Sequence, residues 1–270
     1  MLPGDQRNAY ESIRGWIAER CGIHYPDHKR DLLLQRLSRV QRAFTFDGLE
    51  QLAHHLVIDP QSEVEFAVIS AASTNHTYFY REAEILNHVR ENLLPALASR
   101  DEIRIWSAAC STGDEVFTIA MMVAEALGEA VLERTSILGT DISAPVIERA
   151  ELGIVSERQI AQLPAALKAR FLQPAGLGQY RVDDRLRRRC TFRRMNLRSL
   201  PYPFRNSFQI VFARNVLYYF DNAAQAETLR AIHDVTEAGG HLITSVTESI
   251  RDLGTPWQIE ANGVYRKARV

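Results

Sequence analysis

The segment from Ile103 to Thr118 constrains the fold of this chain more than any other. It reads IRIWSAACSTGDEVFT, in which a strand-like run leads into a loop of small residues that ends at Gly113, and a helical pattern follows. Small side chains allow a ligand to approach the backbone closely. A strand, such a loop and a helix form the opening unit of nucleotide-type α/β domains, where ligands bind beyond the carboxyl ends of the strands. The segment therefore predicts a site for a nucleoside-bearing cofactor.

Size, charge and cysteine content argue against several classes of protein. The 270 residues are 46% hydrophobic, which is enough for a substantial core in one large domain or two modest ones. The formal net charge of -1 gives no overall attraction to nucleic acid or to an anionic membrane. Three cysteines without CxxC spacing support neither a disulfide framework nor a zinc ribbon. No apolar run approaches the roughly 18 residues of a membrane helix, so we expect a soluble protein. The cysteines fit a reducing cytoplasm. We expect no metal site, because Pro26 between His24 and His28 spoils the helical geometry that would bring them together.

Two regions follow one another along the chain. Residues 1–72 carry helical patterns, whereas residues 73–270 alternate strand-like and helical segments, which indicates a mainly parallel sheet. An Asn-Gly pair at 262–263 indicates an antiparallel hairpin at the end of that sheet, and turn formers near 163–191 indicate a small β-rich insertion. The strand-like runs are IRIW from Ile103, TSILGTD from Thr135, CTFRRM from Cys190, FQIVFARN from Phe208 and HLITSV from His241. We therefore predict an N-terminal all-helical domain and an α/β domain with a Rossmann-like sheet, as in class I S-adenosylmethionine-dependent methyltransferases.

Asp141 stands at the end of the run SILGTD, 28 positions after Gly113. Dinucleotide-type folds place an acid near this spacing, where its carboxylate accepts hydrogen bonds from ribose hydroxyls. The alternative is a helix N-cap, because aspartate is a favoured cap and Pro145 suits the first turn of the helix that follows. The sequence leaves both interpretations open, and we favour the ribose role.

The loop that follows the first strand is acidic rather than glycine-rich. It lacks the GxGxxG pattern that brings a backbone against a pyrophosphate. Asp114 and Glu115 would repel a diphosphate at close range, whereas S-adenosylmethionine has no phosphate and carries positive sulfonium and amino groups. The loop therefore favours this cofactor, and the alternative is a pair of solvated acids at a helix N-terminus.

Four stretches spread over nearly the whole chain form a set. They are STNHTYFYRE from Ser73, WSAACSTGDEVFT from Trp106, GTDIS from Gly139 and ARNVLYYF from Ala213. In content and order they resemble the bacterial chemotaxis receptor methyltransferases of the CheR type, whose pattern is close to TTNxTxFFRE, ASTGEEPYS, SDI, NL and RNVxIYF. This resemblance implies methyl transfer from S-adenosylmethionine to glutamates on the cytoplasmic helical region of chemoreceptors, with S-adenosylhomocysteine as the product.

The resemblance also implies a set of site residues, carried over position by position. Arg81 and Tyr219 are implied in catalysis, with Tyr219 near the transferring methyl group. Glu115 is implied to meet the methionyl amino end of the cofactor, and Asp141 is implied to meet the ribose. The other cofactor-binding positions implied in this way are Asn75, Thr77, Arg81, Asn196, Leu197, Asn215 and Val216.

Some positions leave alternatives open. An arginine can hold a carboxylate through two parallel hydrogen bonds, which suits Arg81 to a ligand carboxylate. The alternative is an exposed ion pair of Arg81 with Glu82 or Glu84. Among the departures from the family pattern, Val116 and Phe117 replace Pro-Tyr, His76 and Tyr80 alter the first stretch, and SVTES replaces a pattern resembling GHSE while keeping Glu248. These departures keep a second function in view, a catalytically weak cofactor-binding adaptor.

A basic helix face near the N-terminus predicts where a receptor would dock. Apolar residues recur from Leu33 to Phe44 at helical spacing, while Arg36 and Arg39 lie outside that stripe. We expect these arginines to meet acidic residues of a receptor helix, the alternative being a solvated charged face. We also expect a monomer without direct membrane insertion.

The most basic stretch of the chain offers a rival enzyme class. Eight arginines lie between Arg181 and Arg198, against Asp183 and Asp184. Clustered arginines neutralise phosphates, so this stretch suits an RNA methyltransferase. The overall charge balance argues against that interpretation, and we expect no nucleic acid partner.

Overall fold

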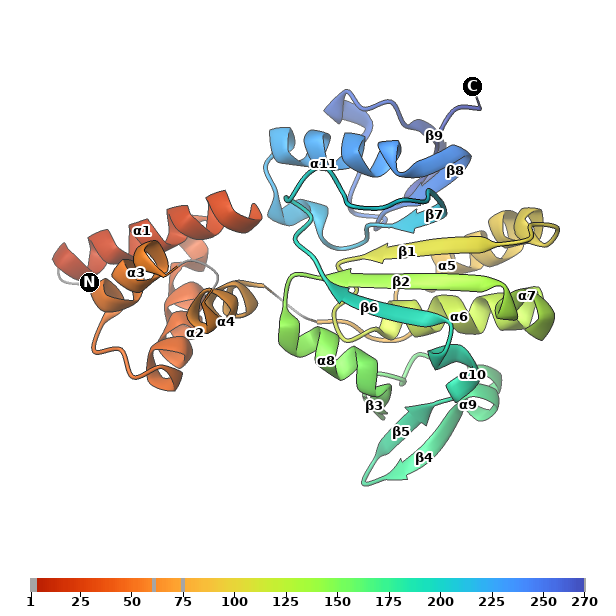
Figure 1. The fold of residues 1–270 in the computed structure, drawn as a ribbon, viewed down its shortest axis with the longest axis horizontal. Coiled ribbons are helices and arrows are strands. Elements are labelled where there is room, and N and C mark those ends of the chain that lie inside the picture. The colour runs from red at the N-terminus through yellow and green to blue at the C-terminus, as the bar shows by residue number, and fades with distance from the viewer. Residues whose placement is uncertain (1–3, 60–61, 74–75, 270) are drawn as a thin grey trace.

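The computed structural model describes residues 4–59, 62–73 and 76–269, and it places a helical module beside a sheet domain (Figure 1). The helices of the module are α1 Gly4–Cys21, α2 Arg30–Ala43, α3 Leu49–Ile58 and α4 Glu63–Ala72, and a 3₁₀ turn, Asp27–Lys29, precedes α2. The predicted all-helical character of this region is therefore confirmed. Within the described residues, no helix combines the length and apolarity needed to span a membrane.

Apolar stripes on these helices form the core of the module. In α2 the predicted stripe is confirmed, because Leu33, Leu37 and Val40 are buried and Phe44 packs against the same core. Helix α1 stops at Cys21 because the next residue, Gly22, has a φ of 73°, a left-handed backbone that favours glycine. The sequence pattern therefore located the buried face of α2.

The sheet domain is built on a mixed sheet. Its strands are β1 Ile103–Ala108, β2 Thr135–Asp141, β6 Cys190–Arg194, β7 Phe208–Phe212, β8 Thr236–Ile243, β9 Gln258–Ala261 and β10 Val264–Arg266. Their order is β6-β2-β1-β7-β8-β10-β9, with parallel pairing from β6 to β8 and antiparallel pairing of β10 with both β8 and β9. The predicted strands are confirmed, and so is the hairpin around residues 262–263.

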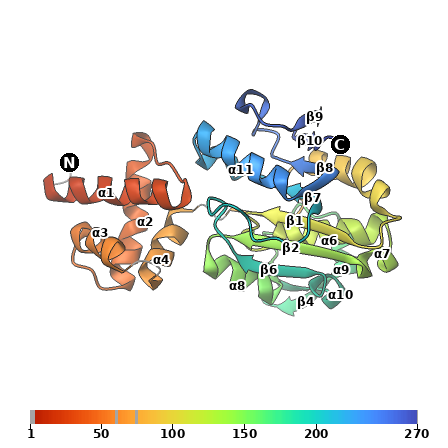
Figure 2. The same cartoon turned by 45° about the horizontal axis from the view of Figure 1, so that its top comes forward.

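Helices cover both faces of this sheet. Their bounds are α5 Ala83–His88, α6 Asp114–Ala126, α7 Glu129–Glu133, α8 Ala144–Leu152 and α11 Asn222–Asp234, and short helical turns span Val89–Leu93, Leu94–Leu97, Leu217–Tyr219 and Arg251–Leu253. On one face, Ile103 and Ile105 of β1 share a core with α5 and α6. On the other, Trp106 of β1 shares a core with α11, which lies alongside β7 and β8 in Figure 2. Burial on both faces explains the continuous apolar runs in the central strands.

A small second sheet extends away from the main one (Figure 1). It consists of β3 Ile154–Ser156, β4 Leu172–Gly176 and β5 Gln179–Val182 in the order β3-β5-β4, with α9 Ala165–Phe171 and α10 Asp184–Arg187 beside them in the chain. The insertion predicted near 163–191 contains β4 and β5, whereas β3 precedes it. A strand of three residues is too short to show an alternating pattern, so the sequence did not reveal β3.

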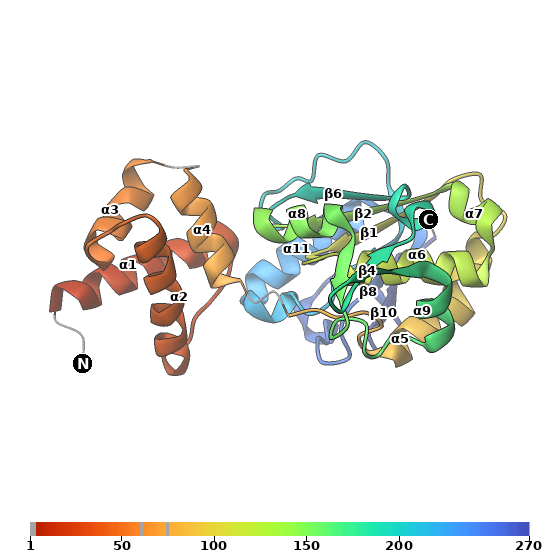
Figure 3. The ribbon, with the colours of Figure 1, turned by 90° about the horizontal axis from the view of Figure 1, so that it is seen from below.

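The helical module contacts the sheet domain beyond the carboxyl ends of β1 and β2 (Figures 1 and 3). The hydrogen bonds between them include His24 N to Tyr219 O at 3.0 Å, Asn196 Nδ2 to Arg20 O at 2.7 Å, and a 2.8 Å bond between the hydroxyls of Ser70 and Ser143. Both regions therefore meet at the edge where the sequence predicts a cofactor site.

Candidate active site

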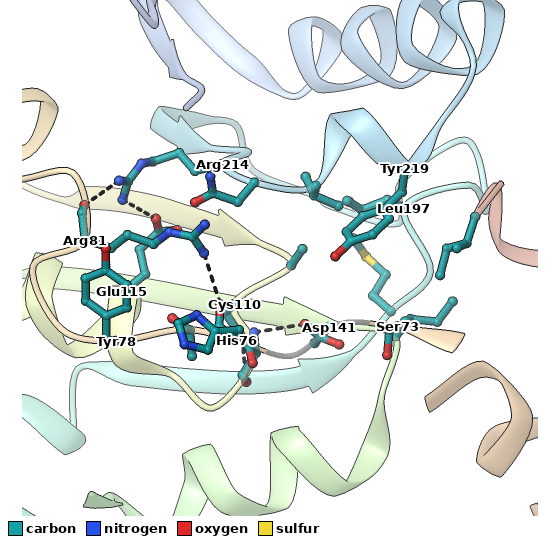
Figure 4. A pocket seen from close by; sticks show the side chains of 18 of the residues that line it. Ser73, His76, Tyr78, Arg81, Cys110, Glu115, Asp141, Leu197, Arg214 and Tyr219 are labelled. Carbon is teal, nitrogen blue, oxygen red and sulfur yellow. Dashed lines mark hydrogen bonds and ion pairs between the residues drawn. The ribbon is translucent and has the colours of Figure 1, made fainter. Parts of the chain in front are cut away.

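A pocket lies at the carboxyl ends of β1, β2 and β7, with a volume of about 960 Å³ including space open to solvent (Figure 4). It brings together residues from all four stretches of the family pattern. The predicted site residues that line it are Thr77, Arg81, Glu115, Asp141, Asn196, Leu197, Asn215, Val216 and Tyr219. Asn75 lies outside the described residues. Residues far apart in the sequence thus share one cavity large enough for a nucleoside-bearing ligand.

The loop after β1 exposes its backbone to this pocket. Ala109 and Ser111 have φ values of 67° and 50°, a left-handed conformation that is uncommon outside glycine, and both line the pocket. Gly113 follows with a φ of 85°, and a Cβ there would come within 3.0 Å of the Cβ of Ala150. Small residues are therefore required for the chain to turn sharply from β1 into α6.

Asp141 ends β2 and presents a buried carboxylate to the pocket. Its Oδ2 accepts the N–H of Ser111 at 2.9 Å, and its Oδ1 accepts the N–H of Ser143 at 3.0 Å. Burial raises the pKa of Asp141, and the backbone donors oppose that rise. The N-cap of α8 is Ser143 rather than Asp141, so the N-cap alternative is wrong. Each carboxylate oxygen retains a lone pair, which leaves Asp141 free to accept hydroxyl groups of a ligand.

Arg214 is the main pocket residue that the sequence analysis missed. Its side chain is only 2% exposed, and its guanidinium forms ion pairs with Glu115 at 2.7 Å and Glu82 at 3.2 Å. It also donates a hydrogen bond to the carbonyl of Arg81. The available signal was an arginine directly after the apolar run FQIVFA, because a charge at the end of a buried strand needs partners. Arg214 thus connects β7, α6 and the segment before α5.

Glu82 completes this network on the side of Ser245 and Asn215. Its Oε1 accepts the Ser245 hydroxyl at 2.7 Å and the Asn215 amide at 3.1 Å. Burial alone would raise the pKa of Glu82, but these two hydrogen bonds and the charge of Arg214 outweigh it and hold the pKa below its usual value. Glu82 is therefore a fixed anion that positions the amide of Asn215 beside the pocket.

Glu248, retained in the altered SVTES segment, organises the loop after β7. Its carboxylate is buried and accepts the backbone N–H groups of Asn215 at 2.6 Å, Leu217 at 2.8 Å, Ser245 at 3.2 Å and Tyr218 at 3.4 Å. Burial raises the pKa of Glu248, and these donors oppose the rise. The departure from the family pattern therefore keeps the residue that shapes this loop.

Arg81 and Tyr219 lie on opposite sides of the pocket in Figure 4. Arg81 donates from Nη1 to the carbonyl of His76 at 3.0 Å. In the part of the chain that the structure describes, neither Glu82 nor Glu84 forms an ion pair with Arg81, so the exposed-pair alternative is wrong. The remaining N–H groups of its guanidinium are available to a ligand carboxylate.

The apolar wall of the pocket comes from both regions of the chain. Leu197 is buried and lies beside Met195 and Ile142 in the lining. Cys21 and Ile23 of the helical module also line the pocket, which the sequence analysis did not predict. An apolar wall, a buried carboxylate and an exposed loop backbone together suit an adenine base and a ribose without requiring a phosphate site.

Arg36 does not lie on the free basic face that the sequence predicted. Its Nη1 donates to the Tyr25 hydroxyl at 2.8 Å and to the carbonyls of Ala71 at 3.2 Å and Ala72 at 3.0 Å, at the end of α4. Helical periodicity identifies a face but not the element that packs on it, and here α4 does. Arg39, by contrast, is exposed.

Internal contacts also engage much of the arginine-rich stretch. The ion pairs join Arg185 to Asp183 and Glu129, Arg187 to Asp184, and Arg198 to Glu227. The guanidinium of Arg194 lies 3.3 Å from the ring centroid of Phe66. Charges held in this way are less available to phosphates, which weakens the RNA interpretation.

Both regions of the chain match known protein families. Residues 75–263 match the family described as CheR methyltransferase, SAM binding domain, and residues 8–68 match CheR methyltransferase, all-alpha domain. The chemotaxis protein methyltransferase of Escherichia coli K12 is 33% identical over 95% of this chain and 89% of its own length. That of Borreliella burgdorferi is 32% identical over 87% of this chain and 86% of its own length. That of Salmonella typhimurium LT2 is 33% identical over 92% of this chain and 86% of its own length.

Proposed function

Because this chain belongs to the CheR methyltransferase family and is an S-adenosylmethionine-dependent methyltransferase, we propose that its methyl acceptors are glutamate side chains on the cytoplasmic helical region of chemoreceptors. The products are glutamate methyl esters and S-adenosylhomocysteine. The observation that carries the proposal is the convergence of Arg81, Asp141 and Tyr219, which come from three separate stretches of the family pattern, on one pocket.

The cofactor would lie along the pocket with its charged end near α6. Asp141 accepts the two ribose hydroxyls with the lone pairs that its backbone donors leave free. Asn196 and Leu197 flank the adenine, and Asn215 and Val216 form the floor. Glu115 accepts the amino group with the lone pairs that remain after its Oε1 accepts the Ser107 hydroxyl at 2.8 Å and its Oε2 pairs with Arg214 at 2.7 Å.

The acceptor needs no general base. A glutamate carboxylate with an ordinary pKa of about 4.3 is already ionised at neutral pH. S-adenosylmethionine, when bound, would supply an electrophilic methyl group: the bond from methyl to the carboxylate oxygen would form as the bond to sulfur breaks, with the electron pair left on sulfur and no proton transferred. The protein's task is therefore to hold the carboxylate oxygen in line with that bond.

Arg81 and Tyr219 are proposed to hold this carboxylate. The carbonyl of His76 accepts a hydrogen bond from only one N–H of Arg81, so the other N–H groups of the guanidinium can donate to a carboxylate oxygen. Tyr219, across the pocket, can donate its hydroxyl to the oxygen that does not attack. Thr77 also lines the pocket. Excluding water favours a reaction in which two opposite charges disappear.

Receptor docking is proposed on the exposed part of α2. Arg39 is exposed and can approach acidic residues of a receptor helix, whereas Arg36 is engaged with the end of α4. An acceptor in the cytoplasmic region of a receptor requires the enzyme in the same compartment. We propose that it acts there as a monomer.

One experiment tests this function against its rivals. The protein is incubated with methyl-labelled S-adenosylmethionine and a receptor cytoplasmic fragment, with a matched fragment carrying alanine at its methylatable glutamates, and with RNA. Label that depends on those glutamates and is released by alkali supports the proposal. Calorimetric binding of the cofactor without transfer would support the adaptor, and label in RNA would support the other enzyme class.

A further inference from the structure

We propose that Tyr218, to which the family pattern assigns no role, is a positioning residue that directs the hydroxyl of Tyr219 toward the acceptor carboxylate. This inference rests on the proposed function and adds a residue to it. The family pattern RNVxIYF has isoleucine at the position of Tyr218, so the hydroxyl at this position is a property of the present chain.

The two tyrosines form a compact pair at the mouth of the pocket. They are adjacent in the 3₁₀ turn Leu217–Tyr219, and their ring centroids lie 4.4 Å apart at an angle of 47°. The Tyr218 hydroxyl donates a hydrogen bond to the Tyr219 hydroxyl at 3.1 Å. Tyr219 lines the pocket, whereas Tyr218 is 53% exposed. The ring of Tyr219 therefore lines the pocket, and the more exposed ring of Tyr218 packs against it.

The backbone under this pair is held from several directions. The carbonyl of Tyr219 accepts the N–H of His24 from the helical module at 3.0 Å, and its N–H donates to the carbonyl of Val216 at 3.2 Å. Glu248 accepts the N–H of Tyr218 at 3.4 Å. Because the main chain is fixed in this way, the direction of the Tyr219 hydroxyl depends on what surrounds its side chain.

Hydroxyl chemistry explains why this neighbour matters. A tyrosine hydroxyl has one hydrogen to donate and can accept hydrogen bonds, whereas an ionised carboxylate can only accept. The donor from Tyr218 fills an acceptor position of the Tyr219 oxygen, so the hydrogen of Tyr219 points away from Tyr218. A hydrogen aimed into the pocket can hold the non-attacking oxygen of the substrate and leave the lone pair of the attacking oxygen free.

The Tyr218 hydroxyl remains protonated under the conditions of the reaction. Partial burial and the neighbouring Tyr219 hydroxyl, together with the charge of Glu248, raise the pKa of Tyr218 above its ordinary value of 10.0, and Arg81 opposes the rise. Tyr218 is therefore a donor at neutral pH, as the geometry requires.

A double-mutant cycle tests the proposal. Tyr218→Phe keeps the ring contact and removes the donor, Tyr219→Phe removes the hydroxyl that it orients, and the third variant combines both. Single-turnover transfer of labelled methyl to a receptor fragment gives the rate, and calorimetry gives the dissociation constant of S-adenosylmethionine. One hydrogen bond predicts a rate between about twofold and tenfold lower for Tyr218→Phe, with unchanged cofactor affinity.

The decisive result is the double variant. If Tyr218 acts through Tyr219, the double variant transfers methyl at the same rate as Tyr219→Phe alone. The proposal would be overturned if the rate reductions of the two single variants multiplied in the double variant. A wild-type rate in either single variant would also overturn it. Tyr180→Phe, which removes a tyrosine hydroxyl from β5 in the small second sheet, is the matched control and should leave the rate unchanged.

Failure of the two proposals can be told apart. If the wild-type protein leaves the receptor fragment unlabelled, the proposed function fails, and this inference fails with it. If wild-type transfer occurs but the cycle shows no coupling, only the role of Tyr218 fails. Thermal unfolding of each variant, expected to match the wild type closely, separates a changed rate from a damaged fold.

Discussion

Replacing Arg214 with methionine should destabilise the sheet domain by about 3 kcal/mol at neutral pH. Removing one partner of a buried ion pair typically costs about 3–5 kcal/mol, because it leaves an uncompensated charge. Glu82 and Glu115 would both lose their cation, but their side chains are 19% and 14% exposed and keep hydrogen bonds from Ser245 and Ser107. These features place the expected loss at the lower end of that range.

Thermal and urea unfolding of the purified variant measure this loss. For a domain of this size, about 3 kcal/mol corresponds to a midpoint lower by roughly 6–12 °C. The matched control is Arg170→Met, which removes an exposed pair with Glu129 at 3.0 Å and should cost no more than about 1 kcal/mol. Adding Glu82→Gln and Glu115→Gln to the Arg214 variant should recover part of the stability. A loss no larger than the control's would refute the reasoning.

The stability lost in the Arg214→Met variant should also depend on pH. In the wild type the pKa of Glu82 is lowered, so its stabilising contribution is present above the ordinary value of 4.5 and is lost as the pH falls through the lowered pKa. The Arg214→Met variant loses the part of this contribution that the charge of Arg214 supplies and keeps the part supplied by the hydrogen bonds from Ser245 and Asn215. The difference in unfolding free energy should therefore be full above about pH 5 and shrink in more acidic buffer.

Three further changes probe other parts of the site. Asp141→Asn should weaken cofactor binding about tenfold or more in calorimetry, because the amide NH₂ cannot accept a ribose hydroxyl or the N–H that Asp141 now holds; equal affinity would remove Asp141 from the ribose role. Glu248→Gln places an NH₂ group among backbone donors and should lower the methylation rate more than the cofactor affinity, and an unchanged rate would argue against its control of the loop. Arg39→Glu should raise the KM for receptor fragments while sparing cofactor affinity, whereas Arg36→Glu should mainly lower the melting temperature; the reverse pattern would contradict the docking assignment.

Periodic features of the chain made most of the fold predictable. Local patterns predicted three features that the structure confirms: the apolar stripe in α2, the alternation of strands and helices, and the Asn-Gly hairpin. Strand β3 escaped notice because three residues cannot establish a period. Local patterns therefore predict long elements well and very short ones poorly.

The site was less accessible to sequence reasoning than the fold. Motif matching identified residues from each stretch that lines the pocket, but it could not show what their neighbours do. Arg214 and Glu82 form ion pairs between positions that are 132 residues apart, and Arg36 packs against a helix end 35 residues away. Such partnerships depend on tertiary packing, which neither spacing nor composition reveals. The same limit hid the contribution of Cys21 to the pocket wall.

The contact between His24 and Tyr219 has a consequence for how binding events communicate. A receptor helix bound to the helical module and a methyl donor bound in the pocket would both act on the interface between the module and the sheet domain. Thermodynamic linkage is reciprocal. If one bound ligand changes the affinity for the other by some factor, the second changes the affinity for the first by the same factor. Coupling through this contact would make the affinity for the methyl donor depend on whether a receptor is bound.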